Sequence, residues 1–433
     1  MNVLRYAAEF GLFLIVAAMV LIGVLTLTHG TPVRTVIAPG PEDQPPPVTD
    51  SLFGRTMELY TGTHIGSGNQ VQLMLNGNGS YPQLWQDLAG AKRTIVVQMY
   101  YSEPGKVADK MRDVLAERAR AGVRVLVLLD AFGSGPLKKT DFLDSLRAAG
   151  AQVEWLRPLR WYTLNKAATR SHVRIVVIDG HIGWTGGFGL ADYWLGDGVH
   201  EHQWRDSNVR FEGPAVAPLD AAFASGWAEA TGVLLTGHNY FPESAFEEVG
   251  PTVAGLMLTV PSVGSTPASR FLALSITAAK KTLYITNSYF VPDQEFRNML
   301  KRASERGVDV RVITAGDKSD VKTTVYAGRA HYVELLRSGI RIYEYIPTMM
   351  HAKSIAVDGM WSSVGSMNFD NRSMAFNNES NLNVLDTSFG AQMDSVFLDD
   401  ITHSKEIKLP EFERRPWTEK LIEWGADKFS SVL

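Results

Sequence analysis

The sequence contains no cysteine among its 433 residues. Disulfide bonds, catalysis by a thiolate and zinc sites with cysteine ligands are therefore excluded. A strong excess of charge of either sign is also missing, because 42 basic and 46 acidic side chains leave a formal net charge of -4. Proteins that bind nucleic acids usually present a basic surface. The balance of charge therefore argues against a nucleic-acid partner.

One long apolar run lies close to the N-terminus. Residues 10–28 carry no charged side chain and are almost all apolar, and a run of this length can cross a bilayer as a helix. A cleaved signal peptide is the alternative, but the run is long for one and no clear small-residue cleavage site follows it. We predict an uncleaved single-pass anchor within residues 1–30, in the cell (inner) membrane. The few flanking charges leave the side of the membrane open.

A proline-rich stretch follows the apolar run. It includes Ala38-Pro-Gly-Pro and three consecutive prolines that begin at Pro45, and such a composition favours an extended spacer over a packed element. We expect residues 31–66 to form a linker between the anchor and the globular part.

Two short motifs share one spacing: a histidine, a basic residue two positions later, an aspartate seven positions after the histidine and a glycine fourteen positions after it. They are His172, Arg174, Asp179 and Gly186 in the first copy, and His351, Lys353, Asp358 and Gly365 in the second. Alternate residues of a strand point to one face, so the imidazole and the cation of each copy lie together. An imidazole can attack phosphorus or pass a proton, and a cation can neutralise phosphate oxygens. The repeated motif indicates phosphodiester chemistry.

The sequence around each motif alternates strand-like and helix-like patterns. Residues 92–101 and 123–129 are rich in β-branched side chains, and residues 106–121 between them have helical spacing. Residues 279–285 and 306–312 are similar in sequence to the two predicted strands and lie about 180 to 190 residues later. Strand, helix and strand in this order predict a parallel sheet with a right-handed crossover. We therefore predict a tandem duplication of one α/β unit, with a site between the two copies on a pseudo-twofold axis.

The two motifs and the short sequences that flank them resemble those of the phospholipase D superfamily and, within it, bacterial cardiolipin synthase. The likeness runs from about Ser67 to Asp386. The similar short sequences include Trp204-Arg-Asp, Asn287-Ser-Tyr-Phe-Val-Pro and Ile342-Tyr-Glu-Tyr. The resemblance implies an α/β fold of two tandem phospholipase D-type α/β sandwich domains, related by a pseudo-twofold duplication and preceded by one N-terminal transmembrane helix.

This resemblance divides the globular part into two domains and a tail. The first phospholipase D-like domain is expected at residues 67–250 and the second at residues 251–408. Residues 409–433 are expected to form an amphipathic tail, because Trp417, Leu421 and Trp424 fall on one helical stripe. The stripe would lie in a membrane interface or pack on the domain, and the sequence leaves both alternatives open.

The resemblance also assigns catalytic roles to six residues. They are His172, Arg174, Asp206, His351, Lys353 and Glu379. His172 would form a phosphohistidine and His351 would act as acid and base, although the sequence itself does not separate the two roles. The two carboxylates, each about 30 residues after a histidine, would fix the imidazole tautomers. The cations come from side chains, so no metal and no cofactor is implied.

Five further motif residues receive supporting roles. Asn368, Ser366 and Gly187 are expected to bind or shape the pocket of the substrate phosphate, because small residues let backbone amides approach it. Asp179 and Asp358 each precede a glycine at the end of a strand, which is ordinary turn chemistry. We interpret both aspartates as structural.

Two positions of the first motif depart from the family pattern. Arg174 occupies a lysine position, and Gly189 occupies the place where the family usually has an asparagine, as Asn368 does in the second copy. Arginine keeps the charge but is bulkier and planar. Losing one hydrogen-bond donor can remove roughly 2 to 4 kcal/mol of transition-state stabilisation. The first half is therefore expected to be slower, differently selective or inactive.

The predicted function is that of a membrane-associated, cardiolipin synthase-like phosphatidyltransferase, which moves a phosphatidyl group between phosphatidylglycerol molecules through a phosphohistidine. A phospholipid and the membrane are the expected partners, and nucleic acid is not. One alternative is a phospholipase D-type phosphodiesterase that hydrolyses phospholipid or nucleic acid. The other is a lipid-binding pseudoenzyme, because of the altered first motif.

Overall fold

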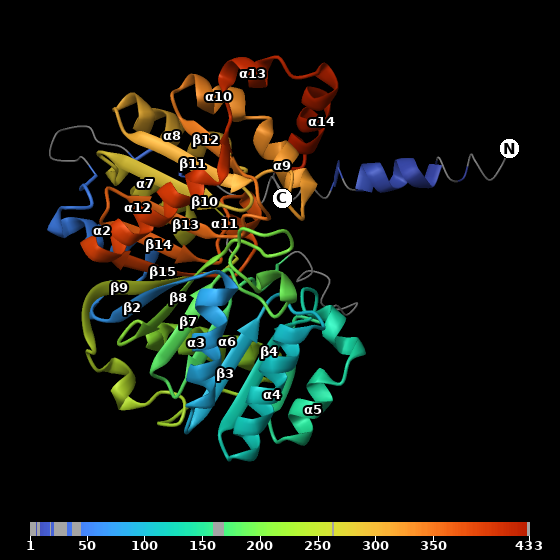
Figure 1. Ribbon diagram of the computed structural model, residues 1–433, viewed down its shortest axis with the longest axis vertical. Helices are drawn as coiled ribbons and strands as arrows, with labels where there is room; N and C mark the ends of the chain where they lie inside the picture. The colour runs from blue at the N-terminus through green and yellow to red at the C-terminus, as the bar shows by residue number, and fades with distance from the viewer. Residues whose placement is uncertain are drawn as a thin grey trace.

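The computed structural model describes residues 6, 9–17, 19–20, 33–36, 45–158, 169–261 and 264–430. Its centre consists of two β-sheets, one mainly from each half of the chain (Figure 1). The strands of the first sheet are β2 (Gln70–Leu75), β3 (Thr94–Met99), β4 (Arg124–Asp130), β5 (Gln152–Leu156), β6 (Ile175–Ile178), β7 (Ile182–Gly186) and β8 (Ser207–Glu212). Those of the second are β1 (Gly66–Gly68), β9 (Gly250–Thr259), β10 (Thr282–Asn287), β11 (Asp309–Ala315), β12 (Arg341–Tyr345), β13 (Lys353–Val357), β14 (Trp361–Gly365), β15 (Glu379–Leu385) and β16 (Ser404–Glu406).

The second sheet repeats the first strand by strand. The order β2-β8-β7-β6-β3-β4-β5 corresponds to β9-β15-β14-β13-β10-β11-β12, and β1 and β16 extend the second sheet at its edges. In both sheets the strands that the sequence repeats, β3–β4 and β10–β11, pair in parallel, whereas β6 and β13 run antiparallel to β3 and β10. The predicted α/β fold is confirmed, but the sheets are mixed, because each histidine motif continues into an antiparallel hairpin.

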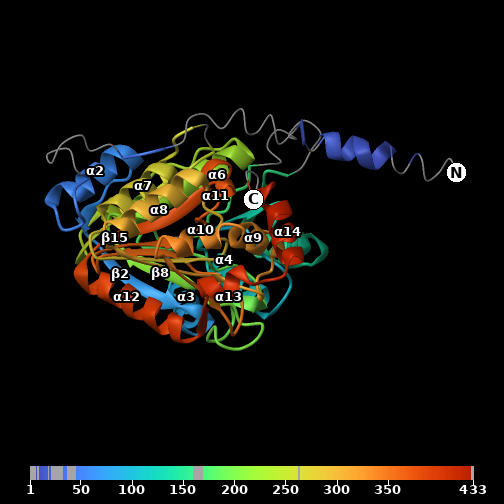
Figure 2. The ribbon, with the colours of Figure 1, turned by 90° about the horizontal axis from the view of Figure 1, so that it is seen from above.

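Helices cover both sheets. Beside the first sheet lie α3 (Asn76–Ala89), α4 (Lys106–Arg120), α5 (Phe142–Ala148) and α6 (Val216–Thr231); beside the second lie α7 (Pro267–Ala278), α8 (Gln294–Glu305), α10 (Tyr332–Arg337) and α12 (Thr387–Thr402). Figure 2 shows α7 and α8 on one side of β15 and α12 on the other. Shorter helices are α9 (Lys322–Arg329), α11 (Asn371–Ala375), α13 (Leu409–Glu413) and α14 (Trp417–Asp427).

Three large apolar cores hold these layers together. One belongs to the first half and one mainly to the second. The third lies between the halves and joins α6 and the inner face of the first sheet to α12 and the inner face of the second. The two halves therefore bury part of their surfaces against each other. The domain boundary predicted at residue 250 stays a prediction.

The structure differs from the predicted linker in the second half of residues 31–66. Residues 51–61 form helix α2 (Ser51–Thr61), whose N-terminus is capped by the Asp50 side chain. Phe53 and Met57 of α2 are buried in the core of the second half, and the Phe53 ring meets the Trp361 ring edge-on with centroids 5.0 Å apart. Apolar side chains at helical spacing, together with a capping aspartate, outweigh the extended tendency of the prolines before them.

The predicted membrane anchor lies partly outside the described residues. Of the apolar run at residues 10–28, residues 10–17, 19 and 20 are helical, and residues 18 and 21–28 are outside the described part of the chain. Within the part that is described, no helix has both the length and the apolar character needed to span a bilayer.

Candidate active site

Each motif histidine is held by the backbone of the opposite half. The N–H of His172 donates to the carbonyl of Asn378 over 2.9 Å, and the N–H of His351 donates to the carbonyl of Arg205 over 2.7 Å. Both contacts continue as short parallel bridges, Ser171 with Asn378 and Arg205 with Met350. The halves are thereby joined at the two points from which the imidazoles project.

The two carboxylates predicted to orient the histidines are exchanged between the halves. Asn378 and Arg205 directly precede Glu379 and Asp206, so each bridge brings the other half's carboxylate to the imidazole. His172 Nδ1 lies 2.9 Å from a Glu379 oxygen, and His351 Nδ1 lies 2.8 Å from Asp206 Oδ2. Sequence order alone would group each carboxylate with the histidine that precedes it. The structure instead places both pairs across the interface.

The basic residue of each motif lies beside its own histidine. Arg174 donates to the carbonyls of His172 and Phe188, and Lys353 donates to the carbonyl of His351. Both cations are almost fully buried, at 1% exposure. Because Arg174 uses two of its donors on the backbone, its guanidinium is fixed in one orientation, which a lysine at this position would not achieve.

Burial sets the protonation state of the site. It lowers the pKa of His172 to about 4, with the nearby Arg174 adding to the effect, and it lowers the pKa of His351 to about 3, with Lys353 adding to the effect. Burial opposes ionisation of the two partner carboxyls, but contact with the imidazoles outweighs it and leaves their pKa values lowered. Ionised carboxylates thus accept from Nδ1, and the free ring nitrogen Nε2 keeps its lone pair.

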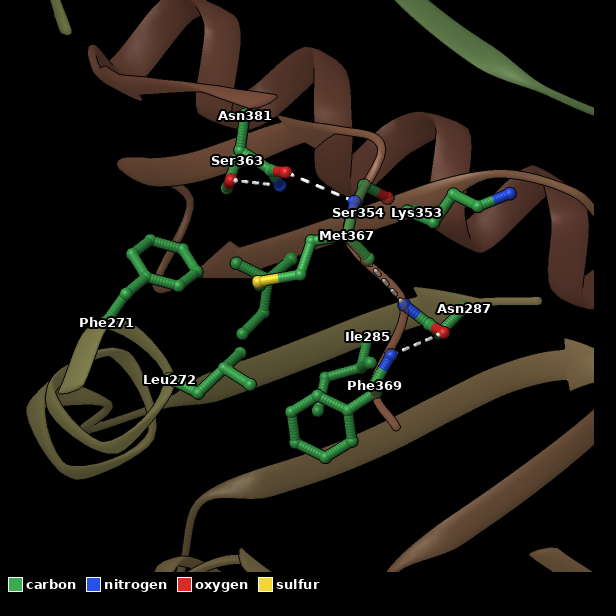
Figure 3. A pocket seen from close by; sticks show the side chains of 11 residues that line it. Phe271, Leu272, Ile285, Asn287, Lys353, Ser354, Ser363, Met367, Phe369 and Asn381 are labelled. Carbon is green, nitrogen blue, oxygen red and sulfur yellow. Dashed lines mark hydrogen bonds between the residues drawn. The ribbon is translucent and has the colours of Figure 1, made fainter. Parts of the chain in front are cut away.

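The loop that carries Asn368 is fastened from two strands. Asn287 of β10 donates to the carbonyl of Met367 and accepts from the N–H of Phe369, and Asn381 of β15 accepts from the N–H of Met367 (Figure 3). The void beside these side chains measures about 20 Å³, which is room for roughly one water. The asparagines therefore position the loop, and the void is too small to hold a substrate.

The small residues of the motifs make room for the carboxylates. A Cβ at Gly187 would meet Asp206 Oδ1 at 2.2 Å, and the N–H of Gly187 donates to Asn208 Oδ1 over 3.0 Å. In the second copy Ser366 is fully buried and donates to Glu379 Oε2 over 2.6 Å. The N–H of Gly187 and the hydroxyl of Ser366 already have protein partners and support the carboxylates, and the part of both residues in the phosphate pocket stays a prediction.

The unusual glycine of the first motif faces an indole ring. A Cβ at Gly189 would meet Trp194 at 2.8 Å and the carbonyl of Tyr101 at 3.0 Å. The Trp194 Nε1 donates to Asp206 Oδ2 over 2.7 Å, and its ring lies edge-on to His351 with centroids 5.2 Å apart. Trp194 thus occupies the space that an asparagine at 189 would need, and it supplies Asp206 with a hydrogen bond.

The two motif aspartates close matching hairpins. Asp179 and Asp358 have φ of 55° and 54° and are followed by glycines with positive φ, the pattern of a tight hairpin turn. Each carboxylate accepts from three consecutive backbone N–H groups at the start of the neighbouring strand: Lys92, Arg93 and Thr94 for the first, and Lys280, Lys281 and Thr282 for the second. These contacts fasten the hairpin that follows each histidine to β3 or β10.

The histidines open into one pocket of about 300 Å³ that both halves line. Arg174 and Asn368 also reach it, and the amide oxygen of Asn368 has no hydrogen-bond partner among the described residues. Sequence reasoning missed the aromatic wall of the pocket: Tyr100, Tyr101, Trp194, Trp204 and Tyr289. Only Trp204 and Tyr289 could have been recognised from the sequence, because both lie in short sequences that resemble the family. The other three rings come from the segment after β3 and from a short 3-10 helix after β7, which only folding brings together.

Comparison with known proteins identifies the family. The family model described as "Cardiolipin synthase, PLD-like domain" matches residues 84–227 and 272–401, together more than half of the chain. The cardiolipin synthase of Geobacillus kaustophilus (strain HTA426) is 32% identical over 374 residues, covering 86% of this chain and 74% of the relative. That of Alkalihalophilus pseudofirmus is 30% identical over 370 residues, covering 85% and 73%.

Solved structures agree in fold. The phosphatidylserine synthase of Haemophilus influenzae Rd KW20 has a TM-score of 0.66 at 16% identity, covering 88% of this chain and all of that one. The polyphosphate kinase of Porphyromonas gingivalis has a TM-score of 0.52 at 12% identity, covering 83% of this chain and 53% of that one. The paired motifs, the duplicated sheets and the sequence relatives lead to one conclusion: the chain belongs to the cardiolipin synthase family of phospholipase D-like enzymes.

Proposed function

We propose that the protein is a membrane-bound phosphatidyltransferase that joins two phosphatidylglycerol molecules into cardiolipin and releases glycerol. The observation that carries this proposal is the crossed pairing of His172 with Glu379 and of His351 with Asp206 in one pocket. Two oriented imidazoles, with buried cations beside them, provide a nucleophile and a proton carrier for a phosphodiester.

The reaction proceeds in two balanced steps. Nε2 of His172 attacks the phosphorus of the first lipid, the bond from phosphorus to the glycerol headgroup breaks, and His351 gives the leaving oxygen its proton. A hydroxyl of the second phosphatidylglycerol then attacks the phosphohistidine, His351 takes the proton from that hydroxyl, and the nitrogen–phosphorus bond breaks. Both histidines return to their starting state.

The first step requires a protonated His351, although burial keeps it neutral in the ligand-free pocket. The bound phosphodiester is an anion beside Lys353 and Arg174, and it offsets the positive charge that helps to lower the imidazole pKa. Substrate binding therefore raises the pKa of His351 and favours uptake of the proton. We assign to Asn368, which lines the pocket, the donation of its amide N–H to a phosphate oxygen.

The choice of transfer over hydrolysis follows from the surroundings of the pocket. In this proposal the aromatic rings that line the pocket keep water away from the phosphohistidine. Sequence relatives that carry the name cardiolipin synthase support a lipid substrate. We assign residues 10–28 as the anchor that keeps the enzyme at the membrane, where both lipids are concentrated.

A product assay tests the proposal. The purified full-length protein is incubated with labelled phosphatidylglycerol in mixed micelles that contain a chelator, and the lipids are separated. Cardiolipin and glycerol are expected, and both are expected to disappear in His172→Ala and in His351→Ala. The matched control is His64→Ala, because the His64 side chain is 77% exposed and lies outside the pocket.

Other products would lead to other conclusions. Phosphatidic acid without cardiolipin would identify a phospholipase. Full cardiolipin synthesis by both histidine variants would overturn the proposed mechanism. A protein that forms no product from any phospholipid donor would be a lipid-binding pseudoenzyme.

A further inference from the structure

Helix α14 is held against the second half by polar contacts and by a small apolar cluster, in which Ala426 packs with Val291 and Ala327. Glu423 is only 4% exposed and pairs with Arg415 just before the helix. Asp427 lies 2.7 Å from His331 Nε2, and the Ser430 carbonyl accepts from the Asn371 side chain over 3.0 Å. The inner face of this helix therefore carries two carboxylates beside one small apolar side chain, whereas a surface helix ordinarily turns its apolar face inward.

The apolar side chains of α14 face away from the protein. Trp417, Leu421 and Trp424 are 72%, 54% and 59% exposed. Spacings of four and three residues place them on one stripe of a helix with 3.6 residues per turn. The buried Glu423 and Ala426 lie on the opposite side of the same helix. The stripe therefore points into solvent. The sequence left two alternatives for the tail, packing on the domain or lying in a membrane interface. In the structure one face of α14 packs on the domain, and the face with the apolar stripe is exposed.

Helix α14, which carries this stripe, packs on elements that line the catalytic pocket. Helices α14 and α9 lie side by side (Figures 1 and 2), and Ala426 packs against Ala327 of α9. Thr324 of α9 lines the catalytic pocket. Arg372 of α11 lines it as well, directly after the Asn371 that binds the end of the tail. Both elements under the tail therefore reach the pocket.

We propose that the stripe formed by Trp417, Leu421 and Trp424 is a membrane-docking ridge. It rests in the headgroup region of a bilayer and turns the mouth of the catalytic pocket towards the lipids. The lipid substrate is taken from the proposed function, but docking itself depends only on the ridge. Tryptophan is enriched at the boundary between lipid and water, where its ring is buried and its N–H remains hydrated.

Charge and size favour a bilayer over a second copy of the chain. Lys420 and Lys428 are exposed beside the ridge, and Lys428 lies over the Trp424 ring at 5.1 Å, whereas Glu423 is turned inward. Exposed cations beside aromatic rings fit an anionic lipid surface. The exposed large apolar side chains of α14, Trp417, Leu421, Ile422 and Trp424, are also few beside the roughly 20–30 residues that each partner contributes to a typical stable interface.

A single label tests docking directly. Because the chain has no cysteine, Leu421→Cys in the full-length protein accepts one environment-sensitive fluorophore. The matched control is Lys110→Cys, an exposed position on α4 in the other half. With phosphatidylglycerol–phosphatidylcholine vesicles, the label at 421 is expected to shift to the blue and to be quenched at least twofold by brominated lipids. The label at 110 is expected to do neither. An unchanged signal at 421, or a lipid-independent shift that grows with protein concentration, would overturn the proposal.

An activity measurement then links docking to turnover. Trp417→Ser combined with Trp424→Ser is expected to lower cardiolipin formation on vesicles about tenfold and to leave turnover of a short-chain, monomeric phosphatidylglycerol unchanged. Trp417→Phe with Trp424→Leu is expected to restore most of the vesicle activity. Equal activity of all variants on vesicles would refute the ridge. A label at 421 that contacts lipid in a protein without any transferase activity would instead refute the proposed function and leave the docking intact.

Discussion

The imidazole of His172 is held by Glu379, a carboxylate of the opposite half that lies 207 positions later in the chain. The same exchange joins His351 to Asp206. Neither half therefore contains a complete pair of imidazole and carboxylate. The duplicated sheets bring the two motifs together, and the bridges at Ser171 and Arg205 set the distance between them.

Replacing the orienting carboxylate should lower turnover strongly. Glu379→Gln is expected to reduce the rate of cardiolipin formation by roughly 10²- to 10⁴-fold, because the amide can stabilise the wrong tautomer and cannot stabilise an imidazolium. Activity measured at fixed lipid fraction in micelles checks the size of the effect.

Unfolding experiments should identify the crossed pairing itself. A double-mutant cycle of His172→Ala with Glu379→Gln is expected to show a coupling of about 0.5–3 kcal/mol in the free energy of unfolding. The same cycle of His172→Ala with Asp206→Asn is expected to be close to additive. A larger coupling with Asp206 would mean that each histidine pairs within its own half.

The basic residues of the two motifs should differ in their response to pH. Burial lowers the pKa of Lys353 to about 7, so its ammonium is lost as the pH rises through that value, whereas a guanidinium keeps its charge. We expect kcat/KM to fall above about pH 7, because the free enzyme then lacks one phosphate-neutralising cation. Lys353→Arg should move this decline to higher pH, and a pH–rate profile that is unchanged in the variant would assign the decline to another group.

Restoring the family's asparagine should impair the protein. Gly189→Asn forces Trp194 to move, since even a Cβ would approach its ring to 2.8 Å, and the hydrogen bond from Trp194 to Asp206 is then lost. We expect activity to fall at least tenfold, in line with the loss of a precisely placed hydrogen bond. An asparagine at Gly187 would be no better placed, because a Cβ there would meet Asp206 Oδ1 at 2.2 Å. A Gly189→Asn variant more active than the native protein would contradict this account of the first motif.

Helix α6 carries a buried carboxyl whose ionisation should cost stability. Burial raises the pKa of Asp220 to about 7. An unfolded chain releases this proton at lower pH than the folded protein, so the native state loses stability as the pH rises from about 4 to about 7. Asp220→Asn removes that loss. The gain in unfolding free energy should be roughly 3 kcal/mol larger at pH 8 than at pH 5, as measured by denaturant titration. An equal gain at both values would place the carboxyl in a solvated environment.

The sequence by itself determined the local elements and the chemical groups. The β-branched runs predicted β3, β4, β10 and β11, since those strands are buried and their side chains select extended backbone. The repeated spacing of histidine, cation, aspartate and glycine reflects one local unit, a strand followed by a tight turn and a second strand. Such a unit depends on neighbouring residues, so it can be read from one stretch of chain.

Only the tertiary structure decided which groups meet. The exchange of Asp206 and Glu379, the indole of Trp194 beside Gly189 and the outward stripe of α14 all depend on segments that are far apart in the sequence. The stripe shows the limit clearly, because helical spacing identifies Trp417, Leu421 and Trp424 as one face but cannot say which way that face turns. Polar contacts of Glu423 with Arg415 and of Asp427 with His331 fix the direction, and the contact with His331 forms only after the second half has folded.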